Sequence, residues 1–207
     1  MSEALTRVLG EAQRMGFIGP GDLGPHLVHA EGFMIALGGA VPERVVDLGS
    51  GGGLPSLVLA EGWGSSMFWL IEANQRRVAY LEEAVETLGW AERVAVLNGR
   101  AEEFGREDSL RGTVDVVTAR GFGPPAVTAE CAAPFLRVGG RLAVSEPPAD
   151  GSRDQDRWPD SGLALLGLAP DAVAPGTKAH FAVLRQRATC SDRYPRRVGI
   201  PTKRPLF

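Results

Sequence analysis

The stretch Val45–Pro55, VVDLGSGGGLP, decides the fold. A short β-branched run ends in an aspartate, and closely spaced glycines then follow up to Gly53. Such glycines let a backbone turn sharply and come close to a ligand. Pro55 fits the first turn of a following helix, where its missing N–H costs nothing. The stretch therefore predicts a strand, a ligand-binding turn and a helix.

Strand-like and helix-like runs alternate along the rest of the chain. This alternation predicts an α/β fold with a doubly wound, mostly parallel, Rossmann-like sheet. Short helices are expected in the first 40 residues, packed on the main domain of residues 41–207. The predicted strands are 44–48, 66–73, 93–99, 113–120, 141–146 and 180–187, and the predicted helices are 54–63, 74–89 and 125–140.

Composition excludes several classes of protein. The chain has 207 residues, 44% hydrophobic and 23% charged, and no apolar run approaches the roughly 20 residues of a membrane span. Because the N-terminus also lacks a secretory core, we expect a cytoplasmic protein. Cys131 and Cys190 show no metal or redox spacing, and His26, His29 and His180 form no ligand pattern, so no metal is expected.

Charge is distributed unevenly along the chain. The net charge is −3, yet residues 185–207 carry seven cations and one acid, which leaves −9 for the residues before them. A basic tail on an acidic body is a candidate for contacts to phosphates. Charge alone leaves open the alternative of a solvated terminal segment.

An acid after the second strand points to the ligand. Glu72 lies 19 residues beyond Gly53, where a carboxylate can accept hydrogen bonds from ribose hydroxyls. The turn and this acid together indicate an adenosine-bearing ligand. A dinucleotide fingerprint would need a small residue where Leu54 stands, and no nucleoside triphosphate loop is present.

The pattern D-x-G-x-G-x-G, from Asp47 to Gly53, resembles the first motif of S-adenosylmethionine-dependent methyltransferases with a doubly wound sheet. Further stretches resemble the glucose-inhibited division protein B family, which are bacterial methyltransferases acting on guanine N7 of 16S rRNA. These stretches are GRAEEF (99–104), VDVVTARGF (114–122), FLRVGGRLAV (135–144) and RYPRRVGIPTKRPL (193–206).

The resemblance implies roles for particular residues. Arg120 would position the reacting groups, and no general base is expected because guanine N7 carries a free lone pair. Phe122 would contact the base, and the small ribosomal subunit or its rRNA would be the partner. The implied contacts to S-adenosylmethionine are Asp47, Gly49, Ser50, Gly51, Gly53, Leu54, Ser56, Glu72, Ala73, Ala101, Glu102 and Arg120, with Asp47 facing the ammonium end. The implied contacts to RNA are Phe122, Arg193, Arg196, Arg197, Lys203 and Arg204.

The chain departs from the family pattern in two places. Ser145 and Glu146 stand where the family usually has Lys-Gly, and Phe33 follows His29 where a serine is usual. Two alternatives stay open on these grounds. One is a divergent paralogue that methylates a nitrogen of a small molecule. The other is a non-catalytic RNA-binding domain that retains the cofactor fold.

Overall fold

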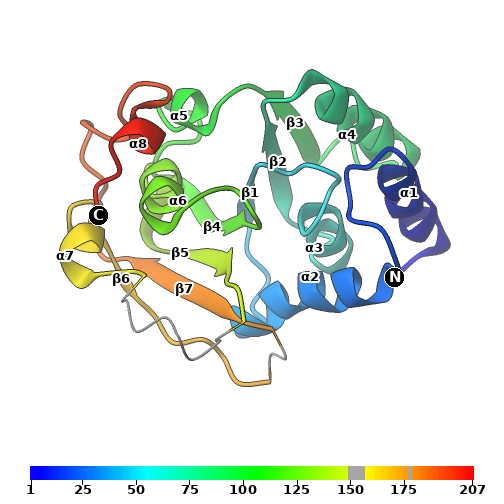
Figure 1. Ribbon diagram of the computed structural model, residues 1–207, viewed down its shortest axis with the longest axis horizontal. Coiled ribbons are helices and arrows are strands. Elements are labelled where there is room, and N and C mark those ends of the chain that lie inside the picture. Colours follow the sequence, from blue (N-terminus) through cyan, green and yellow to red (C-terminus); the bar gives the residue numbers. More distant parts are fainter. Residues whose placement is uncertain (149–156, 177–178) are drawn as a thin grey trace.

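A seven-stranded sheet forms the centre of the protein in the computed structural model, which describes residues 1–148, 157–176 and 179–207 (Figure 1). The strand order is β3-β2-β1-β4-β5-β7-β6. Strands β1 to β5 run parallel, whereas β7 is antiparallel to both β5 and β6. The strands are β1 Arg44–Leu48, β2 Met67–Glu72, β3 Val94–Asn98, β4 Val114–Ala119, β5 Leu136–Ser145, β6 Leu168–Pro170 and β7 Phe181–Gln186.

Helices cover both faces of this sheet. One face carries α1 Glu3–Arg14, α2 Gly24–Ala36, α3 Ser56–Gly62 and α4 Gln75–Thr87. The other carries α5 Ala101–Phe104, α6 Pro125–Ala132, α7 Asp160–Ala164 and α8 Ile200–Lys203. Val45 packs in the first core and its neighbour Val46 in the second, as expected of a strand buried on both faces. The predicted doubly wound sheet is confirmed.

The strand order reverses between β1 and β4. From β1 the chain moves outward through β2 and β3, and it returns to the other side of β1 with β4. Ligands of open α/β sheets bind at such a switch point, beyond the carboxyl ends of the strands. The residues that follow β1 and β4 are therefore the ones best placed to form a site.

Helix α4 begins and ends where the sequence predicts. Asn74 caps it, because its side-chain oxygen accepts hydrogen bonds from the backbone N–H groups of Arg76 and Arg77. Gly89 follows its end with a φ of +68°, a conformation that favours glycine.

The predictions for residues 125–140 and for the chain after β5 are partly wrong. Helix α6 ends at Ala132, and Leu136 already pairs with Val114 in the sheet. The apolar residues around Pro134 fit a buried strand as well as a helix, so periodicity could not separate the two. Strand β6 is absent from the predicted strands, and residues 149–156, which precede it, lie outside the described part of the chain.

No helix in the described part of the chain is long and apolar enough to cross a membrane.

Candidate functional site

The glycine turn after β1 is held against strand β2. The backbone N–H groups of Gly49 and Ser50 both donate to the carbonyl oxygen of Ile71, at 2.9 and 3.2 Å. Gly49 and Gly51 have φ values of +68° and +56°, which explains why the turn needs glycine there. A Cβ placed on Gly51 would meet only the Gly49 carbonyl oxygen, 3.7 Å away. The turn therefore presents its backbone to open space at this point.

Asp47 lies beneath this turn and not on its open side. Its Oδ1 accepts a hydrogen bond from the Thr118 hydroxyl at 2.6 Å, and its side chain is 1% exposed. Burial raises the pKa of Asp47 above its ordinary value. The carboxyl thus ties β1 to β4 below the turn, so the expected direct contact to an ammonium group gains no support.

Glu72 fastens the turn to the start of α4. One carboxylate oxygen accepts the N–H of Gly51 at 2.9 Å, and the other accepts the N–H of Asn74 at 2.8 Å. Each carboxylate oxygen has a second lone pair, so the group keeps acceptor capacity for a ligand. Arg77 lies 4.0 Å away as a partly exposed counter-charge.

Two adjoining cavities lie at the carboxyl ends of the strands, and together they form what we call the strand-end groove. They share Gly49, Arg77 and Gly121. The Arg120 half has a volume of about 280 Å³ and the Glu72 half about 200 Å³. Nine of the twelve predicted cofactor residues line this groove, namely Gly49, Ser50, Gly51, Leu54, Glu72, Ala73, Ala101, Glu102 and Arg120.

The remaining three residues support the turn from inside. Ser56 is fully buried at the start of α3, and Asp47 is buried below the turn. Gly53 has a φ of +89°, and a Cβ on it would lie 2.5 Å from Leu57. These residues shape the turn, and none of them lines the groove.

Arg120 follows β4 directly, and its side chain lines the Arg120 half of the groove. Its Nη2 lies 2.8 Å from Nδ1 of His26 on α2, while its Nη1 is buried and has no hydrogen-bond partner among the described residues. Burial lowers the pKa of Arg120, and the charge of Asp47 opposes this shift. An arginine nonetheless stays charged at neutral pH. The wall of the groove therefore contains a half-buried cation whose Nη2 contacts His26.

The aromatic ring of Phe122 lies over the turn. Its Cδ2 is 3.0 Å from the place a Cβ would take on Gly49, and it lines the Glu72 half. Any side chain on Gly49 would displace this ring. Phe122 is only partly buried, and it lies at the wall where a ligand of the groove would pass.

The predicted RNA-binding cations of the tail have two different environments. Arg196 is bound within the protein, because its Nε and Nη2 donate to the fully buried Glu130 at 2.8 and 2.6 Å. Its own N–H donates to the same carboxylate at 2.8 Å. Arg196 is therefore a structural anchor and not a free phosphate contact. The exposed cations are Arg193, Arg197, Lys203 and Arg204.

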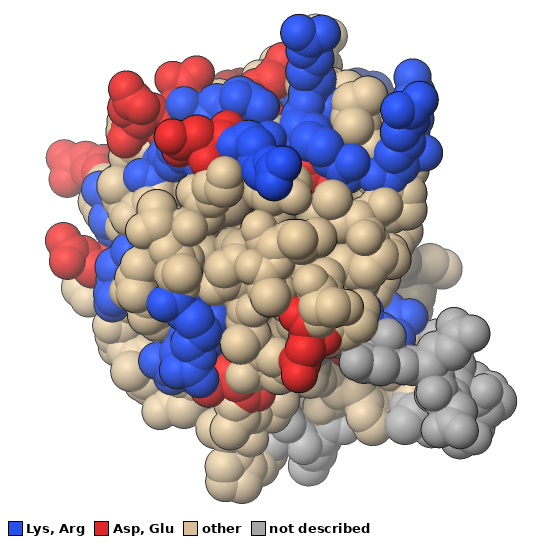
Figure 2. Space-filling model, turned by 90° about the vertical axis from the view of Figure 1, so that its left-hand side faces the viewer, with Lys and Arg blue, Asp and Glu red and all other residues tan. Residues whose placement is uncertain are grey.

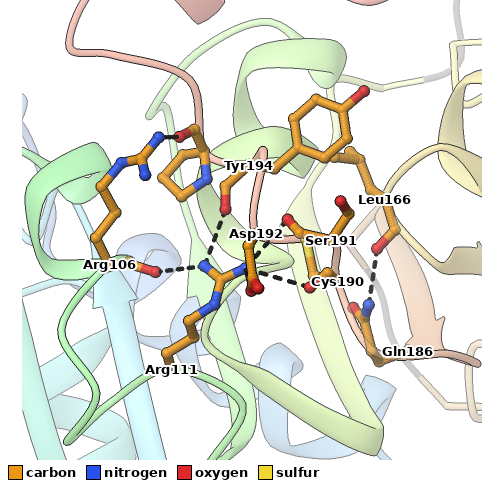
Figure 3. A network of polar contacts seen from close by, with 10 residues as sticks. Arg106, Arg111, Leu166, Gln186, Cys190, Ser191, Asp192 and Tyr194 are labelled. Carbon is orange, nitrogen blue, oxygen red and sulfur yellow. Dashed lines mark hydrogen bonds and ion pairs between the residues drawn. The ribbon is translucent and has the colours of Figure 1, made fainter.

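Arg111, which the sequence analysis overlooked, fixes the chain just before these cations (Figure 3). Its guanidinium donates to the carbonyl oxygens of Tyr194 at 2.9 Å, Ser191 at 3.1 Å and Cys190 at 3.2 Å. Arg106 donates to the Pro195 carbonyl from the same side. No local pattern around residue 111 reveals this role, because its partners lie about 80 positions further along the chain.

The tail contacts a residue that lines the groove. Glu102 lines the Glu72 half, and its Oε1 accepts the backbone N–H of Gly199 at 3.0 Å. Figure 2 shows many Lys and Arg side chains, with some Asp and Glu among them, along the upper edge of the face that carries α8. A basic surface thus adjoins one wall of the groove.

The fold of this protein, with its sheet and the groove at the strand ends, is that of solved methyltransferases. An O-methyltransferase from Bacillus cereus, solved in complex with SAH, matches the structure with a TM-score of 0.61 and 14% identity, over 89% of this chain and 90% of that one. Open space over Gly51, acceptor capacity on Glu72 and the positive charge of Arg120 at the groove wall suit S-adenosylmethionine as the cofactor.

Sequence comparisons give the family. The family model described as rRNA small subunit methyltransferase G matches residues 26–146. Ribosomal RNA small subunit methyltransferase G of Streptococcus pyogenes serotype M3 is 31% identical over 171 residues, 80% of this chain and 70% of the relative. The protein of the same name from Synechococcus elongatus is 30% identical over 169 residues, which are 79% of this chain and 69% of the relative. The chain belongs to the rRNA small subunit methyltransferase G family.

Proposed function

We propose that the protein transfers the methyl group of S-adenosylmethionine to N7 of a guanine in small-subunit rRNA. The observation that carries this proposal is the position of Arg120, a half-buried cation that lines the groove directly after β4. The basic surface beside the same groove supports RNA as the substrate. We expect the activity where bacterial ribosomes are assembled, in the cytoplasm.

The two halves of the groove suit the two ends of the cofactor. Glu72 is the acceptor for the ribose hydroxyls, and Ala101 with Glu102 forms the wall at the adenine edge. The turn around Gly51 accommodates the amino-acid end by close approach of its backbone. When bound, the cofactor supplies a methyl group on a sulfonium, which is reactive enough to be transferred without a covalent enzyme intermediate.

The residues around the target base need only position it. Guanine N7 has a lone pair and no proton to remove, so catalysis rests on alignment. Guanine presents O6 and N7 as neighbouring acceptors, and a guanidinium donor on O6 orients the base and leaves N7 free. Arg120 suits this contact or a contact to the cofactor carboxylate, and Phe122 offers a ring face on which an unstacked base can lie.

The exposed cations of the tail suit RNA phosphates. Arg193, Arg197, Lys203 and Arg204 are exposed, and their backbone is held by Arg111, Glu130 and Glu102. Fixed cations bind a phosphate backbone at a lower entropic cost than mobile ones.

The contacts of Ser145 and Glu146 favour a second candidate function, methylation of a small molecule. Ser145 Oγ lies 2.9 Å from Nε2 of His29, and Glu146 accepts from Nε of Arg157 at 2.6 Å and Nε1 of Trp158 at 3.2 Å. An internal polar network thus replaces the cation that the family usually carries here, which reduces the positive charge available to an RNA.

A competition between substrates tests the proposal. Radiolabelled S-adenosylmethionine is offered with small ribosomal subunits, with naked rRNA and with a metabolite extract, at 50 and 200 mM salt. We expect label in rRNA and a steep loss of rate at high salt, because each phosphate contact releases counterions. Salt-independent labelling of the metabolite extract alone would favour the second candidate, and no labelling of any substrate would favour a non-catalytic domain.

A further inference from the structure

We infer that His26 is a positioning residue for methyl transfer, acting through Arg120. The inference rests on the proposed function of the strand-end groove. His26 belongs to α2, outside the sheet, and neither the cofactor motif nor the tail includes it. It nevertheless lines the Arg120 half of the groove.

The contact between the two side chains has a defined direction. A guanidinium can only donate, so the 2.8 Å contact between Arg120 Nη2 and His26 Nδ1 requires Nδ1 to be the acceptor. The imidazole is therefore neutral in this contact and carries its proton on Nε2. That edge of the ring lies 3.8 Å from the place a Cβ would take on Gly19, which also lines the groove.

The rest of the guanidinium lacks support. Nη1 is buried with no hydrogen-bond partner among the described residues, and Asp47 acts on Arg120 as a nearby charge only. His26 is thus the hydrogen-bond partner that orients the planar group. With Nη2 held by His26, the plane of the guanidinium is fixed at the wall of the groove.

The surroundings of His26 keep it suited to this task. His29 lies one helical turn further along α2, and burial together with the charge of Arg120 lowers its pKa to about 4. It therefore remains neutral at physiological pH and adds no positive charge beside Arg120. A sulfonium bound in the groove would then be repelled by Arg120 alone, and not also by a charged His29.

Two substitutions separate an orienting acceptor from simple packing. His26→Ala removes the acceptor, whereas His26→Asn places an amide oxygen close to the position of Nδ1. We expect His26→Ala to lower kcat for methyl transfer about 10-fold or more, since small displacements of an aligned group are costly. His26→Asn should recover most of this loss, and the exposed His180→Ala is the matched control.

Two further measurements do not depend on RNA. The imidazole ¹⁵N shifts of His26 should show an unprotonated Nδ1, and Arg120→Ala should change them. Calorimetry with S-adenosylhomocysteine should show unchanged or modestly weaker binding in His26→Ala. In an Arg120→Ala background, adding His26→Ala should cost little more, because the two residues act as one unit.

These outcomes distinguish the inference from the proposed function. If wild-type protein methylates no rRNA but the ¹⁵N shifts respond to Arg120→Ala, the proposed function fails and the contact stands. If rRNA is methylated and His26→Ala retains wild-type kcat, the inference is overturned. Equal and independent losses from His26→Ala and Arg120→Ala would overturn it as well.

Discussion

Gly51 donates its backbone N–H to the carboxylate of Glu72, 21 residues away, at 2.9 Å. The contact joins the glycine turn after β1 to the acid that ends β2. Glu72 is thus already engaged in holding the turn that it faces. The two parts of the cofactor motif that the sequence separates form one unit in space.

Replacement of Gly51 by alanine should impair cofactor binding more than stability. Its φ of +56° makes any side chain there cost about 1–2 kcal/mol of folding free energy. The new methyl group would also point into open space over the turn, where the cofactor is expected. We expect S-adenosylhomocysteine to bind at least about 10-fold more weakly by calorimetry, since close backbone approach is lost.

Gly89→Ala is the matched control for this strain. Gly89 has a φ of +68°, nothing within 4 Å of its Cβ position, and no place in the groove. It should lose a similar folding free energy and keep full affinity. Equal affinities for S-adenosylhomocysteine in both variants would place the cofactor elsewhere.

Substitution of Arg120 should show whether geometry or charge matters. Lysine keeps the charge and loses the planar fork that contacts His26. We expect both Arg120→Lys and Arg120→Ala to lower kcat by on the order of 10²-fold, with thermal unfolding of both variants confirming the fold. Nearly full activity in Arg120→Lys would reduce the residue to a local charge.

The neighbours Arg196 and Arg197 should respond in opposite ways. Arg196→Ala leaves the buried Glu130 carboxylate with only the backbone N–H of residue 196 as a donor, and it should lower the free energy of unfolding by about 3 kcal/mol, the low end for a broken buried ion pair. Arg197 is exposed, so Arg197→Ala should change stability by less than about 0.5 kcal/mol. It should instead weaken rRNA binding and reduce the salt slope by about one. Urea unfolding and filter binding at several salt concentrations measure the two effects, and a stable Arg196→Ala protein would contradict the anchoring role.

The lowered pKa of His29 predicts a stability change in mild acid. Its pKa is about 4 in the folded protein, against about 6.5 for an unfolded chain. The unfolded state therefore binds the proton more readily, and the free energy of unfolding should fall as the pH drops from 6.5 to 4. In His29→Gln this slope should be shallower, whereas His180→Gln should retain it. Identical slopes in wild type and His29→Gln would show that His29 does not carry the effect.

Local sequence patterns located the sheet and most of the groove. Short local patterns predict the strand at 44–48, the turn after it, Glu72 and helix α4. These patterns are an apolar run, the spacing of the glycines and an asparagine cap. One interpretation needed the structure. The apolar residues after Pro134 fit helix and strand alike, and only pairing with β4 decides for the strand.

Residues whose partners are distant in the chain could not be assigned from the sequence. Arg196 and Arg197 are adjacent and chemically identical, and only Glu130, 66 residues earlier, separates their roles. His26 and Arg120 are 94 residues apart, and a lone histidine on a helix gives no sign of such a contact. Asp47 belongs to a recognisable motif, yet its burial under the turn depends on Thr118 in another strand.

The most direct test of the account is the position of the transferred methyl group. Small ribosomal subunits lacking the modification are incubated with the protein and S-adenosylmethionine, and the rRNA is then reduced with borohydride and cleaved with aniline, which breaks the chain at N7-methylguanine. The account predicts one new break in the small-subunit rRNA with wild-type protein and its loss with Arg120→Ala. Methyl groups incorporated without such a break, or a break that persists in Arg120→Ala, would contradict it.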